Sequence, residues 1–241
     1  MGLIRNHVLV CGGGGCHSSG TLDLVARLNE EIAKKGLEDE VKVVTTGCMG
    51  LCSLGPVMII HPEGVFYKEV SVEDIPEIVD QHLYKGIIVE RLLYEDPADG
   101  RKLPTVKDIP FFAKQKKIVL RNVGLIDPHK IEEYIAFDGY FALAKVLSSM
   151  KPEDVIQEIM KSGLRGRGGA GFPTGLKWKF TAQAKGDVKY VACNADEGDP
   201  GAYMDRSIIE GDPHTLIEGM AIAGYAIGSN QGYVYIRAEY P

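Results

Sequence analysis

The chain has 241 residues, of which 45% are hydrophobic and 25% charged, so it can bury one large core or two modest ones. Its 33 acidic and 27 basic residues give a formal net charge of −6, which argues against nucleic acid as the main partner. No apolar run reaches the roughly 18 residues of a membrane-spanning helix, and the N-terminal run is too short for a signal peptide. We expect a cytoplasmic protein without membrane insertion.

The first half of the chain begins with a βαβ pattern. Three β-branched runs are predicted as strands, namely residues 7–10, 41–45 and 57–61. Between the first two, apolar residues recur at helical spacing from Leu22 to Ile32. Thr21 or Ser19 is expected as the N-cap of this helix and Gly36 as its C-terminal stop. The pattern favours a small α/β domain.

A second helix and a connector follow. The helix is expected from Ser71, because Asp74 three residues later completes a near capping box. Residues 95–116 carry three prolines and no regular period, which is typical of an irregular join. We therefore divide the chain into a domain at 1–90, a connector with the start of the next unit at 91–124, and a second domain at 125–241.

The second half is also predicted to be α/β. Strands are expected at residues 117–122, 188–194 and 232–240. Helices are expected at residues 129–135, 138–149, 152–162 and 213–227. The third of these helices has Pro152 in its first turn, where proline is favourable.

Four of the five cysteines form two closely spaced pairs, each after a predicted strand. They are Cys11 and Cys16 (C-x4-C) and Cys48 and Cys52 (C-x3-C). In a reducing compartment such pairs favour a metal centre over disulfides. Iron–sulfur clusters take four thiolates, and the glycines in "CGGGGC" and "TGCMGLC" let the backbone approach them. A four-cysteine zinc site and four structural cysteines remain alternatives.

The cysteine spacing, with "GCMGLC" before "GPVMIIHPEGVFY", resembles the thioredoxin-like 2Fe-2S ferredoxins over about 90 residues. The resemblance implies a 2Fe-2S cluster bound by these four cysteines. One-electron transfer is the chemistry that such a cluster would supply.

A glycine-rich stretch, "RGRGGAGFPTG", occupies residues 165–175. A Rossmann motif needs a strand immediately before it, whereas a helix is predicted here, and no P-loop Lys-Ser/Thr follows. Glycines allow the backbone to lie against a flat or phosphorylated ligand, and the neighbouring basic residues can neutralise phosphate. Phe172, Trp178 and Phe180 favour stacking on a ring. The alternative is an ordinary flexible loop.

An acidic stretch, "CNADEGDPGAYMDR", follows the strand predicted at 188–194. Such strand ends commonly carry ligand contacts in α/β proteins. Its spacing does not fit an EF-hand, and a solvated acidic turn is the alternative. Its amide and carboxylates suit ribose or ribityl hydroxyls and the polar edge of a flavin.

Together with "EGDPHTLIEGMAIAGYAIG", these two stretches resemble the FMN- and NADH-binding flavoprotein subunit of complex I and of NAD-linked hydrogenases. With the ferredoxin domain in front, the chain is most similar to the beta subunit of NAD(P)-linked or electron-bifurcating iron hydrogenases. The resemblance implies FMN contacts from Gly166, Arg167, Gly168, Lys177, Asn194, Asp196 and Glu197. It implies contacts to NAD(H) or NADP(H) from Gly169, Phe172, Phe180 and Asp199. Cys193 has no implied ligand role.

The resemblance also implies the overall function. A hydride would pass between NAD(P)H and FMN, single electrons would pass through iron–sulfur clusters, and partners would be subunits of a hydrogenase or NADH dehydrogenase complex. The protein's work would be to bind, orient and tune cofactors, with no catalytic side chain. Family members continue with further segments, including a 4Fe-4S domain, so the chain is expected to be truncated. A non-enzymatic 2Fe-2S electron carrier or assembly module is the alternative.

Overall fold

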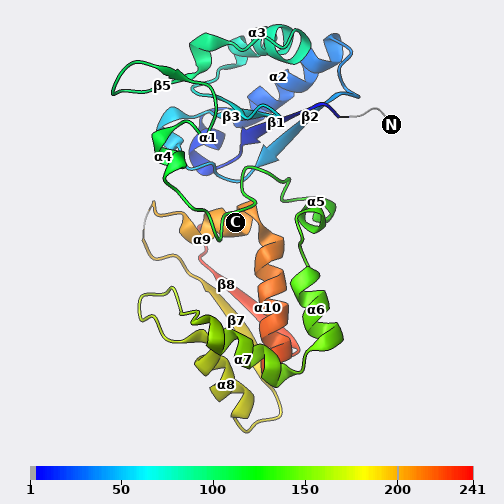
Figure 1. The fold of residues 1–241 in the computed structure, drawn as a ribbon, viewed down its shortest axis with the longest axis vertical. Coiled ribbons are helices and arrows are strands. Elements are labelled where there is room, and N and C mark those ends of the chain that lie inside the picture. Colours follow the sequence, from blue (N-terminus) through cyan, green and yellow to red (C-terminus); the bar gives the residue numbers. More distant parts are fainter. Residues whose placement is uncertain (1–3, 200, 241) are drawn as a thin grey trace. The chain divides into compact units, whose positions relative to one another are not determined.

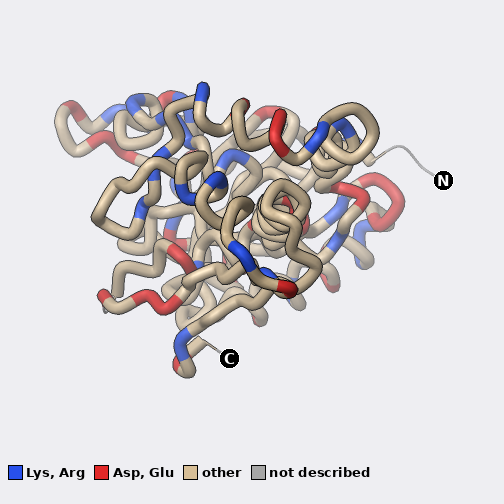
Figure 2. The backbone as a smooth tube through the Cα atoms, turned by 90° about the horizontal axis from the view of Figure 1, so that it is seen from below, with Lys and Arg blue, Asp and Glu red and all other residues tan. Residues whose placement is uncertain are grey.

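The structure is a computed structural model that describes residues 4–199 and 201–240. The chain divides into two compact units, Met1–Lys130 and Ile131–Pro241, called unit 1 and unit 2 below (Figure 1). Acidic and basic residues are interspersed along the backbone (Figure 2). None of the described helices is long and apolar enough to cross a lipid bilayer.

A four-stranded mixed sheet forms the centre of unit 1. Its strands are β1 (Asn6–Cys11), β2 (Val41–Thr46), β3 (Met58–His61) and β4 (Val65–Tyr67). The strand order is β2-β1-β3-β4, with β1 parallel to β2 and antiparallel to β3, and β3 antiparallel to β4. The three strands predicted in this half are confirmed.

Helix α2 (Thr21–Lys34) connects β1 to β2 and confirms the βαβ pattern. Its buried face carries Leu24, Leu28 and Ile32, whereas Leu22 is 61% exposed. The expected N-cap was wrong: Gly20 occupies that position in the left-handed region at φ +99°. Thr21 instead lies in the first turn, where its buried hydroxyl donates to the Cys11 carbonyl at 2.9 Å.

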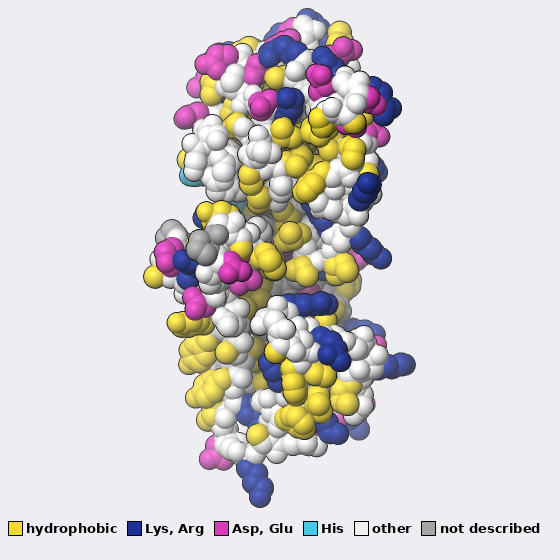
Figure 3. Space-filling model, turned by 90° about the vertical axis from the view of Figure 1, so that its left-hand side faces the viewer, with side chains coloured by type: hydrophobic (Ala, Val, Ile, Leu, Met, Phe, Trp, Pro, Cys, Tyr) yellow, Lys and Arg dark blue, Asp and Glu magenta, His cyan; other side chains and the backbone are white. Residues whose placement is uncertain are grey.

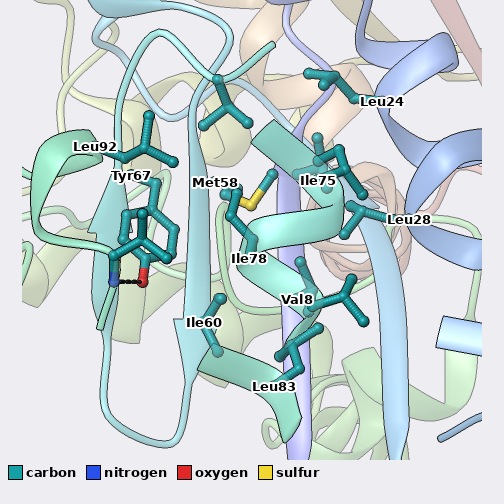
Figure 4. Packing of buried hydrophobic residues seen from close by; sticks show 14 of the residues in the cluster. Val8, Leu24, Leu28, Met58, Ile60, Tyr67, Ile75, Ile78, Leu83 and Leu92 are labelled. Atoms are coloured by element: carbon teal, nitrogen blue, oxygen red, sulfur yellow. Dashed lines mark hydrogen bonds between the residues drawn. The ribbon is translucent and has the colours of Figure 1, made fainter. Parts of the chain in front are cut away.

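The two faces of β1 enter two separate apolar clusters because strand side chains alternate. Val8 and Val10 join a cluster with α2, Tyr67 and the helical segment after Ser71 (Figure 4). This segment runs through the turn Val72–Asp74, α3 (Ile75–Glu77) and the π-helical Ile78–Tyr84. The predicted capping box is confirmed, since the Ser71 amide and hydroxyl both donate to Asp74 at 2.8 Å.

Within unit 1, residues 94–124 cover the opposite face of the sheet. They contain β5 (Tyr94–Glu95), β6 (Lys102–Leu103) and α4 (Pro110–Ala113). Phe112 and Ile109 are buried in one cluster with Leu9 and Phe66 of the sheet. The Phe66 amide donates to the Pro104 carbonyl at 2.8 Å, which fastens this segment to β4. The expected irregular connector is therefore partly ordered.

The strand predicted at residues 117–122 was wrong. These residues form bends and turns, in which the Val123 amide donates to the Leu120 carbonyl at 3.2 Å. Ile118 is 68% exposed and Val119 is 50% exposed. β-Propensity needs a partner strand and a surface to cover, and this segment has neither.

Unit 2 packs helices on a two-stranded parallel sheet. Its helices are α5 (Ile131–Ala136), α6 (Phe141–Ser149), α7 (Pro152–Ser162), α8 (Thr174–Gln183), α9 (Met204–Gly211) and α10 (Pro213–Ile227). Its strands are β7 (Tyr190–Ala195) and β8 (Gln231–Ile236). The four helices and two strands predicted here are confirmed, while α8 and α9 were not predicted. The core groups Val146, Val155, Ile156 and Ala226, with Trp178 partly buried against them.

A buried carboxylate anchors the start of α6. Glu218 is 7% exposed and accepts hydrogen bonds from the Tyr134 hydroxyl and from the Tyr140 and Leu143 amides. Burial by itself raises the pKa of Glu218, but these hydrogen bonds outweigh it and hold the pKa below its usual value. The ionised carboxylate therefore stabilises the folded form.

Replacing Glu218 with alanine is expected to lower the free energy of unfolding of unit 2 by about 3 kcal/mol, because one buried and two partly buried donors lose their acceptor. Glu210→Ala is a suitable control, since Glu210 makes an exposed pair with Arg206 worth less than about 1 kcal/mol. Urea unfolding followed by fluorescence of the single tryptophan, Trp178, reports on this unit.

The stabilisation of unit 2 by Glu218 is expected to be lost at acidic pH. Because the folded pKa of Glu218 is lowered, its contribution is present above the unfolded value of about 4.3 and is lost as the pH falls towards the folded pKa. A smaller acid-induced loss in Glu218→Ala than in the wild type is the expected result. Equal stability of wild type and variant near pH 7 would contradict this role.

Candidate cluster and flavin sites

The four paired cysteines come together at one end of the unit 1 sheet. Cys11 ends β1 and Cys16 lies in α1 (Gly14–Ser18), the short helix formed by the glycine run. Cys48 follows β2, and Cys52 opens the turn Cys52–Leu54. Parallel pairing of β1 with β2 places Cys11 opposite Thr46, so both pairs emerge at the same edge.

The thiols contact one another in a row. A hydrogen bond with Cys16 is the largest influence that raises the pKa of Cys11, and the same bond lowers the pKa of Cys16 to about 7. A hydrogen bond with Cys11 raises the pKa of Cys48. Burial and then the neighbouring Cys48 raise the pKa of Cys52. In residues 4–199 and 201–240, no three His, Cys, Asp or Glu side chains surround one point as a single metal ion requires.

Glycines are needed where the thiols approach the backbone. A Cβ at Gly13 would lie 2.7 Å from the Cys48 Cβ and 2.9 Å from its Sγ, and a Cβ at Gly55 would lie 2.8 Å from the Cys16 Sγ. Real Cβ atoms do not tolerate such distances. A side chain at position 13 or 55 would therefore collide with a cysteine, so both positions need glycine.

Backbone amides point at the sulfur atoms. The Met49 amide donates to the Cys11 Sγ at 3.4 Å. Val57 and Gly50 amides donate to Cys16 and Cys48, and both bonds lower the pKa of the thiol that accepts them. Such bonds favour the thiolate form and tune the reduction potential of an iron–sulfur cluster. Four adjacent thiols with amide donors fit the binding of a cluster.

The glycine-rich stretch of unit 2 is a closed loop between α7 and α8. The Gly166 amide donates to the Phe172 carbonyl and the Thr174 amide to the Leu164 carbonyl, both at 2.9 Å. Gly169 and Gly171 adopt φ of +99° and +61°, in the left-handed region that favours glycine. Gly168 has no positive φ, and a Cβ there would meet nothing within 4 Å. The loop thus presents bare backbone at its tip.

The side chains expected around this loop separate into two groups. Phe172 is 42% exposed and Phe180 is 56% exposed, so both rings are available to a ligand. Arg167 and Lys177 are also exposed. Trp178, in contrast, packs partly buried in the helical core and is not a stacking surface.

The acidic stretch begins at the end of β7 and leads to α9. Asn194 and Asp196 are exposed, and the Asn194 Oδ1 accepts from the Asp196 amide at 3.0 Å. Asp199 is exposed as well. Cys193, on β7, is a free thiol whose pKa is raised by burial. Most of the polar groups predicted here are therefore accessible.

Glu197 differs from its neighbours because its carboxylate is buried and accepts hydrogen bonds from other parts of unit 2. It is 7% exposed, accepts from the Met204 amide at the start of α9, and accepts from the Tyr240 hydroxyl at 2.9 Å. Its carbonyl accepts from the Arg237 guanidinium at 2.6 Å. Burial alone raises the pKa of Glu197, but the hydrogen bonds lower it overall. The sequence did not reveal Arg237 and Tyr240 as partners, because they lie 40 and 43 positions further along the chain.

Both loops lie on the same side of unit 2 in Figure 1, at the left of β7. Viewed from that side, unit 2 shows Lys and Arg side chains around an apolar patch (Figure 3). This combination suits a ligand with an aromatic ring and a phosphate.

The regions that carry these two arrangements match two families, an iron–sulfur ferredoxin and a flavin-binding domain. Residues 3–83 match the family model described as thioredoxin-like [2Fe-2S] ferredoxin, and residues 159–241 match the Nuo51 FMN-binding domain. The chain therefore contains a region that matches the ferredoxin family, followed by a region that matches the FMN-binding domain, and the four paired cysteines lie within the first of these regions.

Two curated relatives match large parts of the chain. The NADP-reducing hydrogenase subunit HndC of Solidesulfovibrio fructosivorans is 60% identical over 128 residues, which is 53% of this chain and 26% of that protein. The NAD-reducing hydrogenase HoxS subunit alpha of Cupriavidus necator is 37% identical over 198 residues, 81% of this chain and 30% of that protein. The chain thus spans less than a third of the length of these relatives.

A solved structure is similar to unit 1. The thioredoxin-like [2Fe-2S] ferredoxin from Aquifex aeolicus is 34% identical, covers 39% of this chain and 99% of its own, and gives a TM-score of 0.36.

Proposed function

We propose that this chain is the electron-transfer part of an NAD(P)H-dependent oxidoreductase subunit. The observation that carries the proposal is the joining, in one chain, of a four-thiol cradle to an FMN-binding domain. Bound FMN would exchange a hydride with NAD(P)H, and the cluster would accept or supply one electron at a time. The hydrogenase and NADH-quinone oxidoreductase names of the relatives support both the nucleotide and partner subunits of these types.

In unit 1 the protein's task is to hold thiolates and tune them. Cys11, Cys16, Cys48 and Cys52 would bind the cluster. The amides of Met49, Val57 and Gly50 would then stabilise negative charge on the sulfur atoms. The free state of all five cysteines is consistent with a reducing compartment, and we place the protein in the cytoplasm.

In unit 2 the bare loop and the exposed polar groups would hold the flavin. The backbone at Gly166 and Gly168 allows close approach, and Arg167 and Lys177 would neutralise the FMN phosphate. Asn194 and Asp196 would bind ribityl hydroxyls. Because the Glu197 carboxylate accepts from the Met204 amide and the Tyr240 hydroxyl, we assign it to holding the shape of this loop rather than to a direct contact.

The nucleotide would lie next to these residues. Phe172 and Phe180 offer exposed rings for stacking on nicotinamide or adenine. Gly169 leaves room for the nucleotide, and Asp199 would accept from a ribose hydroxyl. Each of these assignments is part of the proposal.

The purified protein is expected to contain two iron atoms, two acid-labile sulfides and one FMN per chain. Anaerobic titration with NADH or NADPH should bleach the flavin absorbance and then produce the electron paramagnetic resonance signal of the reduced cluster. Iron and sulfide without flavin, and no response to either nucleotide, would instead support a simple 2Fe-2S electron carrier.

A further inference from the structure

Unit 1 contains a cavity of about 610 Å³ that adjoins the cluster cradle at Met49 and is separate from the flavin loops. It lies between the turn after β3 and residues 105–125, which include helix α4. Met49 forms part of its wall, next to the cluster ligand Cys48. A volume of this size is within the range of small-molecule sites, about 300–1,000 Å³.

The cavity combines apolar walls with unbalanced positive charge. Ile59, Phe112 and Val123 supply buried apolar surface. Lys107, Lys117 and Arg121 also line it, whereas Glu63 is the one carboxylate among the lining residues. Across the part of the chain that the structure describes, none of these three cations forms an ion pair within 4 Å. Lys117 has its ammonium 5.6 Å from the centre of the Phe112 ring.

A buried imidazole adds a specific hydrogen-bonding atom. His61 lines the cavity, and its Nε2 is buried without a hydrogen-bond partner among the described residues. Buried polar atoms normally have partners, so an isolated one marks a place where a ligand or water binds. Burial also lowers the pKa of His61, which keeps the ring neutral near pH 7.

We propose that this cavity binds a small organic anion. Its apolar body would lie against Ile59 and Phe112, and its negative group would be neutralised by Lys117 and Arg121. An uncharged apolar ligand would leave the cations without a partner. An inorganic anion would leave the apolar walls uncovered. The site does not depend on the proposed function of the flavin loops.

The test uses 8-anilinonaphthalene-1-sulfonate, a small aromatic anion, as the probe. Calorimetric titration into the whole protein is preferable to fluorescence, because an iron–sulfur cluster absorbs visible light. Saturable binding of about one probe per chain is expected. The double variant Lys117→Met, Arg121→Met should bind at least about 10-fold more weakly, since two charge-assisted contacts are removed.

Matched controls separate this site from general apolar binding. Lys102→Met removes an exposed charge of unit 1 that is not part of the cavity wall, so it should leave the affinity unchanged. Ala113→Trp, at an exposed wall position, should block the cavity and remove binding. The circular dichroism spectrum checks that each variant is folded.

Two results would overturn the proposal. One is equal affinity of the probe for the wild type and for the folded Lys117→Met, Arg121→Met variant. The other is equal affinity of the wild type for N-phenyl-1-naphthylamine, an uncharged analogue of the probe, which would show that charge plays no part.

Discussion

Replacing Cys48 with serine is expected to destroy the 2Fe-2S centre or to change its spectrum severely. Cys48 is a central member of the row of thiols, in contact with both Cys11 and Cys52. Removing a group that hydrogen-bonds to a metal ligand typically lowers metal affinity by about 10- to 100-fold. Removing a thiolate that binds the cluster itself should lower the affinity at least as much. Iron and sulfide analysis, with electron paramagnetic resonance of the reduced variant, measures the loss.

Cys193→Ser is the matched control for this experiment. Cys193 lies on β7 in unit 2, so its replacement should leave iron content and cluster signal unchanged. An unaltered cluster signal in Cys48→Ser would remove this residue from the ligand set. Loss of iron in the Cys193 variant would show that the cradle of unit 1 is not the complete site.

Replacing Gly168 with valine is expected to weaken FMN binding by about 100-fold or more, equivalent to about 2.7 kcal/mol. The loop itself has room for the new side chain, because Gly168 has no positive φ and a Cβ there meets no protein atom within 4 Å. The variant should therefore fold, and its side chain would occupy the space that bound flavin needs.

Gly219→Val provides the comparison. Gly219 is an exposed glycine of α10 with open space around its Cβ position and no positive φ. Flavin content after gel filtration and the dissociation constant for FMN are measured for both variants. Stoichiometric FMN in Gly168→Val, at wild-type affinity, would mean that the loop is an ordinary connection.

The regular elements were largely predictable because each has a local signal. The β-branched runs of β1, β2 and β3, the helical periodicity of α10 and the Ser71–Asp74 box all appear in the structure. The strand expected at 117–122 failed because its apolar residues have no partner strand. The N-cap of α2 was expected at Ser19 or Thr21, but Gly20 occupies this position because the backbone there has a φ of +99°, which favours glycine.

Side-chain environments were less predictable than elements. Spacing identified the four cysteines, since neighbouring parallel strands bring their ends to one edge. Spacing did not show that Trp178 turns inward or that Glu197 is enclosed by Tyr240 and Arg237. Nor could it show the unpartnered nitrogen of His61, because long-range packing creates that environment.

The packing of residues 91–124 on the sheet has a consequence for how the cluster domain folds. The ferredoxin family match ends at residue 83, yet Phe112 covers Phe66, and the Gly124 amide donates at 2.9 Å to Thr46, two residues before Cys48. The packed unit is therefore longer than the part of the chain that matches the family. A substitution far from any cysteine, in a segment outside the family match, is expected to loosen the loop that carries Cys48.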